Sequence, residues 1–207
     1  MDPTAILATG VTAAGLGLAW VGVLRTRPAG PGDPADYLRT LDDTFEEPLD
    51  DYQKKHKGLA GYPGAKAISR EEFFASDVDI FVPAALELQI GKDEAKEMAC
   101  KVVVEGANGP TDLEGEKILI DKGIDVIPDI LANSGGVIVS YYEWLQNKRS
   151  ESWELEEVQM RLERRMRRSY QTVADRMREL KTDMRTTCYA IALERLREVY
   201  RARGIWP

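Results

Sequence analysis

The 207-residue chain has few of the residues that hold metal ions or form disulfides. It contains one histidine, His56, and two cysteines, Cys100 and Cys188, which lie far apart and form no CxxC pair. These counts exclude a disulfide framework and a cysteine-rich zinc site, and they leave no histidine-based metal cluster or Ser-His triad. We predict no metal site. Because few cysteines suit a reducing compartment, we predict a cytoplasmic protein.

Positive charge is also scarce, since 28 Lys and Arg residues face 35 Asp and Glu residues and the net charge is −7. This balance argues against a dedicated nucleic-acid-binding protein. Arginines do cluster in one stretch, but glutamates stand one or two helical turns away, which is typical of a salt-bridged helix face. The cluster consists of Arg161, Arg164, Arg165, Arg167 and Arg168. We therefore predict no nucleic-acid partner.

Residues 1–47 differ in character from the rest of the chain. Residues 5–24 carry no charge, and a linker with three prolines and two glycines follows at 28–34. Twenty such residues are long enough to span a bilayer, but they are only moderately apolar, and no basic region precedes them as in a secretory signal. We predict a helix over 5–24. We favour an atypical apolar leader or a misjoined gene start for 1–47 over a membrane anchor, which could involve residues 5–24 alone.

From residue 48 onward, short apolar runs alternate with polar, helix-prone stretches. The runs lie near residues 78–82, 101–104 and 124–127, and each is apolar except for one charged residue, as in strands buried on both faces of a parallel sheet. The alternation predicts the α/β class, with a partial Rossmann-like parallel sheet of about three strands. We assign residues 48–207 to a partial dinucleotide-binding domain with C-terminal helices.

The chain after Gly135 is predicted to be helical. Residues 152–181 carry apolar side chains at intervals of three and four, which indicates an amphipathic helix with one buried stripe. A last helix begins near residue 183 and ends at Gly204. Its predicted inward side chains are Cys188, Ile191, Leu196 and Val199. The aromatic side chains Tyr141, Tyr142 and Trp144 of the helix after Gly135 are expected in the core.

Ligands of an open parallel sheet bind at the carboxyl ends of the strands. The loops that leave this edge are rich in small residues, and two of them carry Asn108 and Asn133. An asparagine side chain both donates and accepts hydrogen bonds, so it matches a carboxamide such as that of nicotinamide. Gly135 and Gly136 open a helix whose free N–H groups suit an anion. The same residues also form ordinary turns, so a ligand site and plain turns both stay open.

Several strings in this region resemble one known family. VPAALE (82–87), VVEGANGPT (103–111), VIPDILANSGGVIVSYYEW (126–144) and the ending RGIWP resemble the nucleotide-binding domain of glutamate dehydrogenases, in the family of Glu, Leu, Phe and Val dehydrogenases. EGANGPT and DILANSGGV are specific to the glutamate enzymes. The resemblance covers about residues 48–207. Three positions depart from it: Leu88 stands where Asn is common, Asp112 where Thr is common, and Ser134 where Ala is common.

The resemblance implies an activity and a site. The activity is NAD- or NADP-dependent oxidative deamination of glutamate to 2-oxoglutarate and ammonia. Ala84, Asn108 and Asn133 would line the nicotinamide and its ribose. Val137 and Ser140 would face the substrate, with Ser140 hydrogen-bonded to the side-chain carboxylate of glutamate. The resemblance also implies a homo-oligomer or a partnership with a full-length homologue.

Other parts of the family pattern have no counterpart in the sequence: the amino-terminal substrate domain with its lysine motif, and the GxGxxG turn that holds the pyrophosphate. We assign no catalytic residue. Lys92 and Asp129 lie near the ligand edge, but nothing in the sequence pairs them, so we interpret them as a helix-surface lysine and a turn aspartate. We expect a truncated chain that is inactive alone. The alternative is a non-catalytic binding or regulatory module that associates with a partner subunit.

Overall fold

The fold is described from a computed structural model of the chain. The structure describes residues 22–24, 51–52, 54–57 and 68–204. They belong to two compact units. The first unit is Met1–Val103 with Gly109–Asp125, and the second is Val104–Asn108 with Val126–Pro207. Because most of residues 1–47 lies outside the described residues, the division of the chain near residue 47 stays a prediction.

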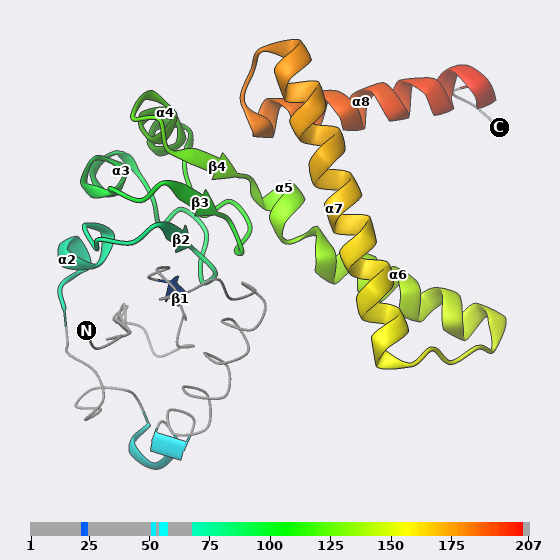
Figure 1. Cartoon of the computed structure of the whole chain (residues 1–207), viewed down its shortest axis with the longest axis horizontal. Coiled ribbons are helices and arrows are strands. Elements are labelled where there is room, and N and C mark those ends of the chain that lie inside the picture. Colours follow the sequence, from blue (N-terminus) through cyan, green and yellow to red (C-terminus); the bar gives the residue numbers. More distant parts are fainter. Residues whose placement is uncertain (1–21, 25–50, 53, 58–67, 205–207) are drawn as a thin grey trace, which may run out of the picture. The chain divides into compact units, whose positions relative to one another are not determined.

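Four short strands form one sheet in the order β1-β2-β3-β4 (Figure 1). The last three begin one or two residues after their predicted starts, at Ile80–Val82 (β2), Val102–Val104 (β3) and Asp125–Ile127 (β4). β2 and β3 pair in parallel, with Ile80 opposite Val102. Two backbone hydrogen bonds join β3 to β4, from Asp125 N to Lys101 O and from Glu105 N to Ile127 O, and their order is that of parallel strands. The predicted α/β class with three parallel strands is confirmed.

The first strand corrects the prediction for residues 5–24. β1, at Gly22–Leu24, pairs antiparallel with β2 and places Val23 opposite Phe81. The predicted helix is therefore wrong at these three residues, and its remainder lies outside the described residues. An open strand edge offers a row of unpaired N–H and C=O groups, and pairing with that edge outweighs the weak helix propensity of a glycine-rich segment. Among the described helices, none combines the length and the apolar character that crossing a membrane requires.

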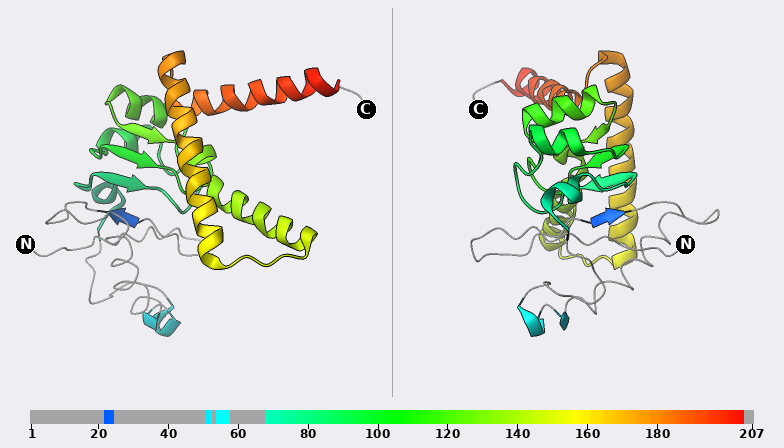
Figure 2. Two further views of the ribbon diagram at one scale, coloured as in Figure 1. Left: turned by 45° about the vertical axis from the view of Figure 1, so that its right-hand side comes forward. Right: turned by 90° about the vertical axis from the view of Figure 1, so that its left-hand side faces the viewer.

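Three helices of the first unit lie along the same side of the strands (Figures 1 and 2). They are α2 (Arg70–Phe74), α3 (Lys92–Glu97) and α4 (Leu113–Asp121). Successive parallel strands joined by crossovers of one hand place their helices on one face in this way. The ring of Phe81 on β2 lies 5.2 Å from that of Phe73 and 5.6 Å from that of Phe74, measured between centroids. All three rings are buried, so they form the core between α2 and the sheet.

In the crossover from β3 to β4, the backbone of α4 lies close to the backbone of Ile90. A Cβ atom at Gly115 would lie 2.6 Å from the carbonyl oxygen of Ile90, so only glycine allows α4 to pack against this segment. Asp112 caps α4 by accepting a hydrogen bond from Gly115 N at 2.7 Å. Asp and Thr both cap helices, so the departure from the family pattern at Asp112 keeps this role.

Lys122, directly after α4, ties α4 to α3. Its Nζ donates to the carbonyl oxygens of Ala95 at 3.1 Å and of Lys96 at 2.6 Å, and also to that of Met98. These carbonyls belong to the last turn and C-cap of α3, where backbone acceptors have no partner within the helix. An ammonium group there also offsets the negative end of the helix dipole. A single side chain thus closes the end of one crossover helix from the other.

The second unit is helical, as predicted. α5 (Asp129–Ala132) is one turn, and α6 (Ser134–Arg149), α7 (Leu155–Leu180) and α8 (Met184–Arg203) follow. α8 ends at Gly204, whose φ of 77° lies in the left-handed region, as predicted for a helix-stop glycine. Leu131 of α5, Val173 of α7 and Cys188 of α8 form a buried apolar cluster. The three helices therefore share one small core.

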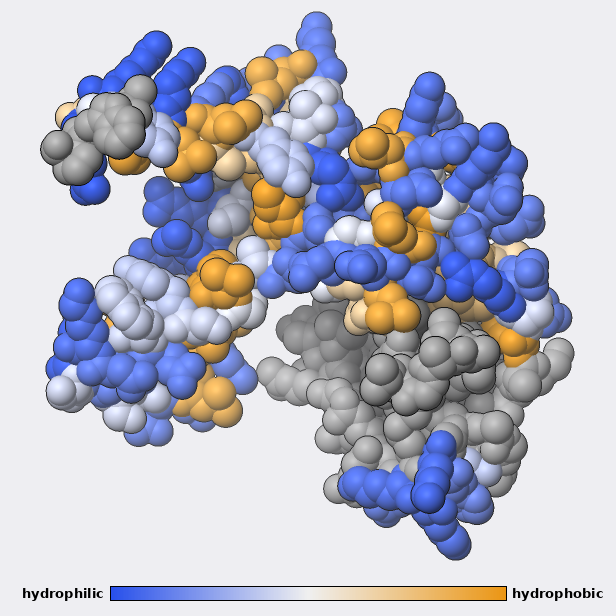
Figure 3. All heavy atoms as spheres, turned by 180° about the vertical axis from the view of Figure 1, so that it is seen from behind, coloured by the Kyte–Doolittle hydropathy of each residue, from blue (hydrophilic) through white to orange (hydrophobic). Residues whose placement is uncertain are grey.

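Some side chains that were predicted to be buried are exposed. Leu196 and Val199 of α8 are 53% and 51% exposed, and Tyr141 and Trp144 of α6 stack on each other at the surface. On the face in Figure 3, apolar side chains lie between hydrophilic ones along α6 and α8. The predictions for these four side chains are wrong, and on α8 the reason is that its buried and half-buried residues all fall within 184–194. Helical periodicity identifies an apolar face, but not how far along the helix it is covered.

Leu88, one of the departures from the family pattern, has a backbone conformation that disfavours it. Its φ is 53°, in the left-handed region, and its side chain is 69% exposed. Leu88 N donates to Gly109 O at 2.8 Å, which holds the turn in place. Asparagine tolerates the left-handed region better than leucine, because its short polar side chain can hydrogen-bond locally. This accounts for the asparagine that is common at the position.

Replacing Leu88 with Asn should therefore stabilise the protein. We expect Leu88→Asn to raise the free energy of unfolding by roughly 1 kcal/mol, because left-handed strain is relieved and no buried contact is lost. Urea denaturation followed by circular dichroism measures the change. Leu113→Asn is the matched control, since Leu113 is also exposed but begins α4 in a helical conformation. A gain at Leu113 as large as that at Leu88 would contradict the explanation.

Candidate functional site

The structure brings together the two asparagines that the sequence predicted as ligand-binding. Asn108 lies in the loop after β3, and Asn133 caps the end of α5, after β4. Asn133 Nδ2 donates to Asn108 Oδ1 at 2.7 Å and to Gly106 O at 3.4 Å. Both residues belong to the second unit and follow the carboxyl ends of neighbouring parallel strands. The predicted juxtaposition of the two side chains is therefore seen.

The short helix α5 is attached at both ends to the loop that contains Asn108. At its start, Asp129 N donates to Glu105 Oε2 at 2.9 Å, and at its end Asn133 contacts Gly106 and Asn108. A single helical turn is not stable alone, so these attachments define its position. These hydrogen bonds thus join the loop after β3 to the loop after β4.

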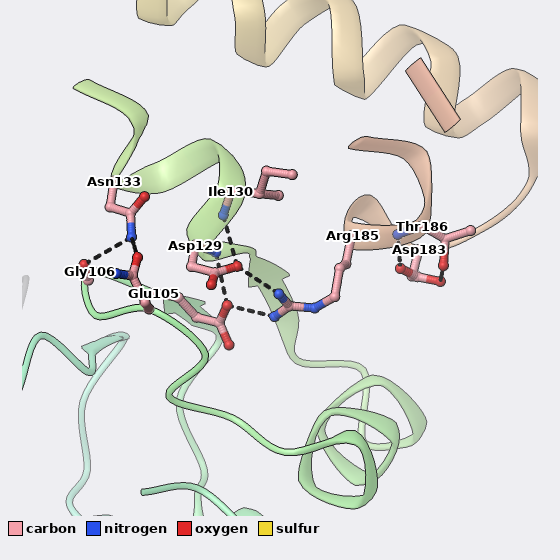
Figure 4. Close-up of polar contacts among 9 residues, drawn as sticks. Glu105, Gly106, Asp129, Ile130, Asn133, Asp183, Arg185 and Thr186 are labelled. Atoms are coloured by element: carbon pink, nitrogen blue, oxygen red, sulfur yellow. Dashed lines mark hydrogen bonds and ion pairs between the residues drawn. The ribbon is translucent and has the colours of Figure 1, made fainter. Parts of the chain in front are cut away.

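A buried ion network lies at the start of α5 (Figure 4). Arg185 of α8 places Nη2 2.6 Å from Glu105 Oε2 and Nη1 2.7 Å from Asp129 Oδ1. The Glu105 side chain is 0% exposed, and those of Arg185 and Asp129 are 17% and 19% exposed. The second oxygen of Glu105, Oε1, is also buried and accepts no hydrogen bond from any residue that the structure describes. One guanidinium therefore links α8 to both loops.

The cap of α8 supports this position of Arg185. Asp183 accepts hydrogen bonds from the N–H and the hydroxyl of Thr186, each at 2.7 Å. Burial is the largest single effect and alone would raise the pKa of Asp183, but hydrogen bonds from Thr186, from Thr182 and from its own backbone together outweigh it, so the pKa lies below its usual value. A carboxylate at the cap also offsets the unfavourable placement of a cation in the first turn of a helix.

Two charged residues near the edge were expected to have no partner, and both have one. Lys92 lies on the surface of α3, as interpreted, and pairs with Glu114 at 3.1 Å, with both side chains more than half exposed. Asp129 begins α5 and is bound by Arg185. Arg185 itself was missed. The sequence feature that could have identified it is a positively charged residue in the first turn of a predicted helix, where the helix dipole disfavours positive charge.

Val137 and Ser140, predicted to face the substrate, lie on the first two turns of α6 and are exposed. They follow Asn133 by four and seven residues, a spacing that aligns all three along one face of a helix. At 1.5 Å per residue, Ser140 stands about 10 Å along the axis from Asn133.

The two glycines near the start of α6 differ from the prediction at one position. Gly136 N donates to Asn133 O at 3.3 Å, so the prediction of a free N–H is wrong for Gly136, and for Gly135 it stays a prediction. The cause is that α5 runs almost directly into α6 and supplies its first acceptors. A Cβ atom at Gly135 would lie 3.6 Å from Leu162 of α7, an ordinary van der Waals distance, so the contact with α7 does not itself require glycine.

Ala84, the fifth predicted site residue, is exposed directly after β2 in the first unit. Its meeting with the asparagines of the second unit stays a prediction. Among the described residues, no group of three or more His, Cys, Asp and Glu side chains is arranged to hold a metal ion. In the arginine cluster of α7, Arg161 pairs with Glu157 at 2.7 Å and Arg167 with Glu163 at 2.8 Å, as in a salt-bridged helix face.

Parallel strands with amide-bearing loops at their carboxyl edge define the class of Rossmann-like α/β domains. The sequence profile of the Glutamate/Leucine/Phenylalanine/Valine dehydrogenases matches residues 37–204. The chain belongs to this family.

Relatives of this chain include both cofactor types. The NAD-specific glutamate dehydrogenase of Clostridioides difficile is 44% identical over 154 residues, which are 74% of this chain and 37% of that enzyme. The NADP-specific enzyme of Synechocystis sp. is 42% identical, over 74% of this chain and 38% of the relative. The hetero-hexameric glutamate dehydrogenase from Thermus thermophilus, in a Leu-bound form, is a structural neighbour with a TM-score of 0.71 and 34% identity, covering 77% of this chain and 38% of that one. The chain thus spans less than two fifths of the length of these relatives.

The apolar cluster beneath α5 should make Cys188 unreactive. Burial raises the pKa of the Cys188 thiol to about 11. At pH 8 about one such thiol in a thousand is ionised, against about one in four for an ordinary cysteine. In a Cys100→Ala variant, we expect Cys188 to react with a thiol reagent at least about a hundredfold more slowly in the folded chain than in urea. Equal rates in the two states would show that the cluster is open to solvent.

Proposed function

We propose that this chain supplies the nicotinamide- and substrate-facing part of an NAD- or NADP-dependent glutamate dehydrogenase. The reaction transfers a hydride from Cα of glutamate to the nicotinamide and then hydrolyses the imine to 2-oxoglutarate and ammonia. The observation that carries the proposal is the hydrogen-bonded pair of Asn108 and Asn133 at the carboxyl ends of β3 and β4. Support also comes from relatives that are named NAD-specific and NADP-specific glutamate dehydrogenases.

The proposed roles are those that the family resemblance implies for these residues. Asn108 and Asn133 hydrogen-bond the carboxamide of the nicotinamide and its ribose, because their side chains offer both donors and acceptors. Ala84 contributes a small side chain beside the ring. Val137 packs against the substrate, and the hydroxyl of Ser140 donates to its side-chain carboxylate. We assign no general base and no cationic site for the α-carboxylate within this chain.

A second function rests on a different observation. The Thermus thermophilus neighbour is described as hetero-hexameric, so a glutamate dehydrogenase can contain non-identical subunits. A chain that keeps the asparagine loops without a general base would act there as a binding or regulatory subunit. Three results together would favour this function over the first. The chain would co-purify with a full-length homologue, it would bind the cofactor, and neither protein would give turnover without the other.

Cofactor binding tests the asparagine pair directly. We expect the chain to bind NADH or NADPH weakly, and we expect Asn133→Ala to weaken binding at least about tenfold, because a hydrogen-bonding amide is lost from the proposed site. Titration followed by nicotinamide fluorescence measures the affinity. Asn147→Ala is the matched control, since Asn147 lies exposed near the far end of α6. If the two variants bind equally well, the asparagine pair is not the nicotinamide site.

Turnover tests the share of the activity that this chain holds. We expect the purified 207-residue chain to give no measurable reduction of NAD or NADP with glutamate, because general acid–base help is typically worth ~10²–10⁴-fold and no base is assigned here. Absorbance of the reduced cofactor is the readout. Turnover above background that disappears in Ser140→Ala would contradict the expectation and would mean that the chain contains a base.

A further inference from the structure

The network of Glu105, Asp129 and Arg185 joins elements that are distant in the sequence. Arg185 lies 80 residues after Glu105 and 56 after Asp129, yet one guanidinium binds both carboxylates at 2.6–2.7 Å. The planar fork of arginine holds two acceptors in a fixed relation, which a lysine cannot do. The relative position of the two loops is therefore defined by a group on α8.

We propose that Arg185 is a positioning residue, which sets the geometry of the Asn108–Asn133 pair from α8. The inference deepens the proposed function, because it rests on these asparagines as the nicotinamide contacts. Arg185 does not reach them itself. It acts through Glu105, which begins the loop that contains Asn108 three residues later, and through Asp129, which begins the helical turn that ends at Asn133.

The contacts transmit position because α5 is so short. Glu105 Oε2 accepts from Arg185 at 2.6 Å and from Asp129 N at 2.9 Å, so one oxygen joins α8 to the start of α5. Asp129 Oδ1 accepts from Arg185 at 2.7 Å and from Ile130 N at 2.8 Å, which fixes the first turn. Asn133 follows within four residues of Asp129. A change of direction at the start of α5 must therefore move the side chain at its end.

A purely stabilising ion pair would have a different geometry. Arg176 offers the comparison within the same unit: it joins Glu179 at 2.8 Å and Glu194 of α8 at 2.7 Å. It too binds two carboxylates, but both belong to long helices and neither lies in a loop of the sheet edge. Arg185 instead binds a fully buried carboxylate, where loss of the partner leaves a charge uncompensated. Comparing Arg185 with Arg176 therefore distinguishes positioning of the asparagine loops from general stabilisation of α8.

Nuclear magnetic resonance of the ¹⁵N-labelled 207-residue chain tests the proposal without any cofactor. The readouts are the side-chain amide signals of Asn133, assigned by their loss in Asn133→Asp, and the hydrogen exchange of the Asp129 backbone amide. In Arg185→Met we expect the Asn133 signals to shift or broaden, and Asp129 exchange to accelerate at least about tenfold, since its acceptor loses its position. In Arg176→Met we expect neither change, even where the melting temperature falls.

Conservative variants keep the test decisive if Arg185→Met does not fold. Arg185→Lys retains the charge and reaches one carboxylate, so the signals should lie between those of the wild type and those of Arg185→Met or of Glu105→Gln. Unchanged Asn133 and Asp129 signals in folded Arg185→Met, or in folded Glu105→Gln, would overturn the proposal. Equal changes in Arg176→Met would also overturn it. A wild-type chain that binds neither NADH nor NADPH would contradict the proposed function, whereas the resonance changes would still decide the role of Arg185.

Discussion

Burial of the Glu105 carboxylate is the constraint on which the second unit depends. An ionised carboxylate with no exposed surface costs several kcal/mol in lost hydration unless charge and hydrogen bonds compensate it. The compensation comes from Arg185 and from the N–H of Asp129. Because the first is on α8 and the second starts α5, neither helix can move independently of the loop after β3. The apolar cluster of Leu131, Val173 and Cys188 packs the same helices together, so shape and charge demand the same arrangement.

In the first unit, close backbone contacts rather than a buried charge pair hold the elements together. Its crossover helices approach so closely that Gly115 has no space for a side chain, and Lys122 binds the free carbonyls at the end of α3. Asp112 caps the start of α4 in the same region. These contacts are local to the crossovers. They hold α3 and α4 together and leave the carboxyl ends of the strands to the loops.

Much of the fold could be predicted because its signals are local. Apolar runs gave the three parallel strands to within two residues, and apolar periodicity gave α7 and α8. The asparagine loops could be located because they follow strand ends. What failed depends on partners far away in the sequence. β1 is a strand because the edge of β2 is open to it, and Asp129 is paired because Arg185, 56 residues later, reaches it. The C-terminal half of α8 also carries apolar residues at helical spacing, but this spacing does not indicate whether another element covers them.

The hydrogen bond between Asn133 and Asn108 also has a consequence for which molecules can enter the site. In the chain alone, the Nδ2 group of Asn133 donates to Asn108 Oδ1 at 2.7 Å. A ligand that inserts between them must first break this bond, and it recovers the loss only by offering a donor and an acceptor in its place. A carboxamide does both, whereas a carboxylate of the same shape offers acceptors alone and leaves Asn108 Oδ1 without a donor. Under the proposed function, the pair would therefore favour a carboxamide over the corresponding acid, because only the carboxamide replaces both partners of the broken hydrogen bond.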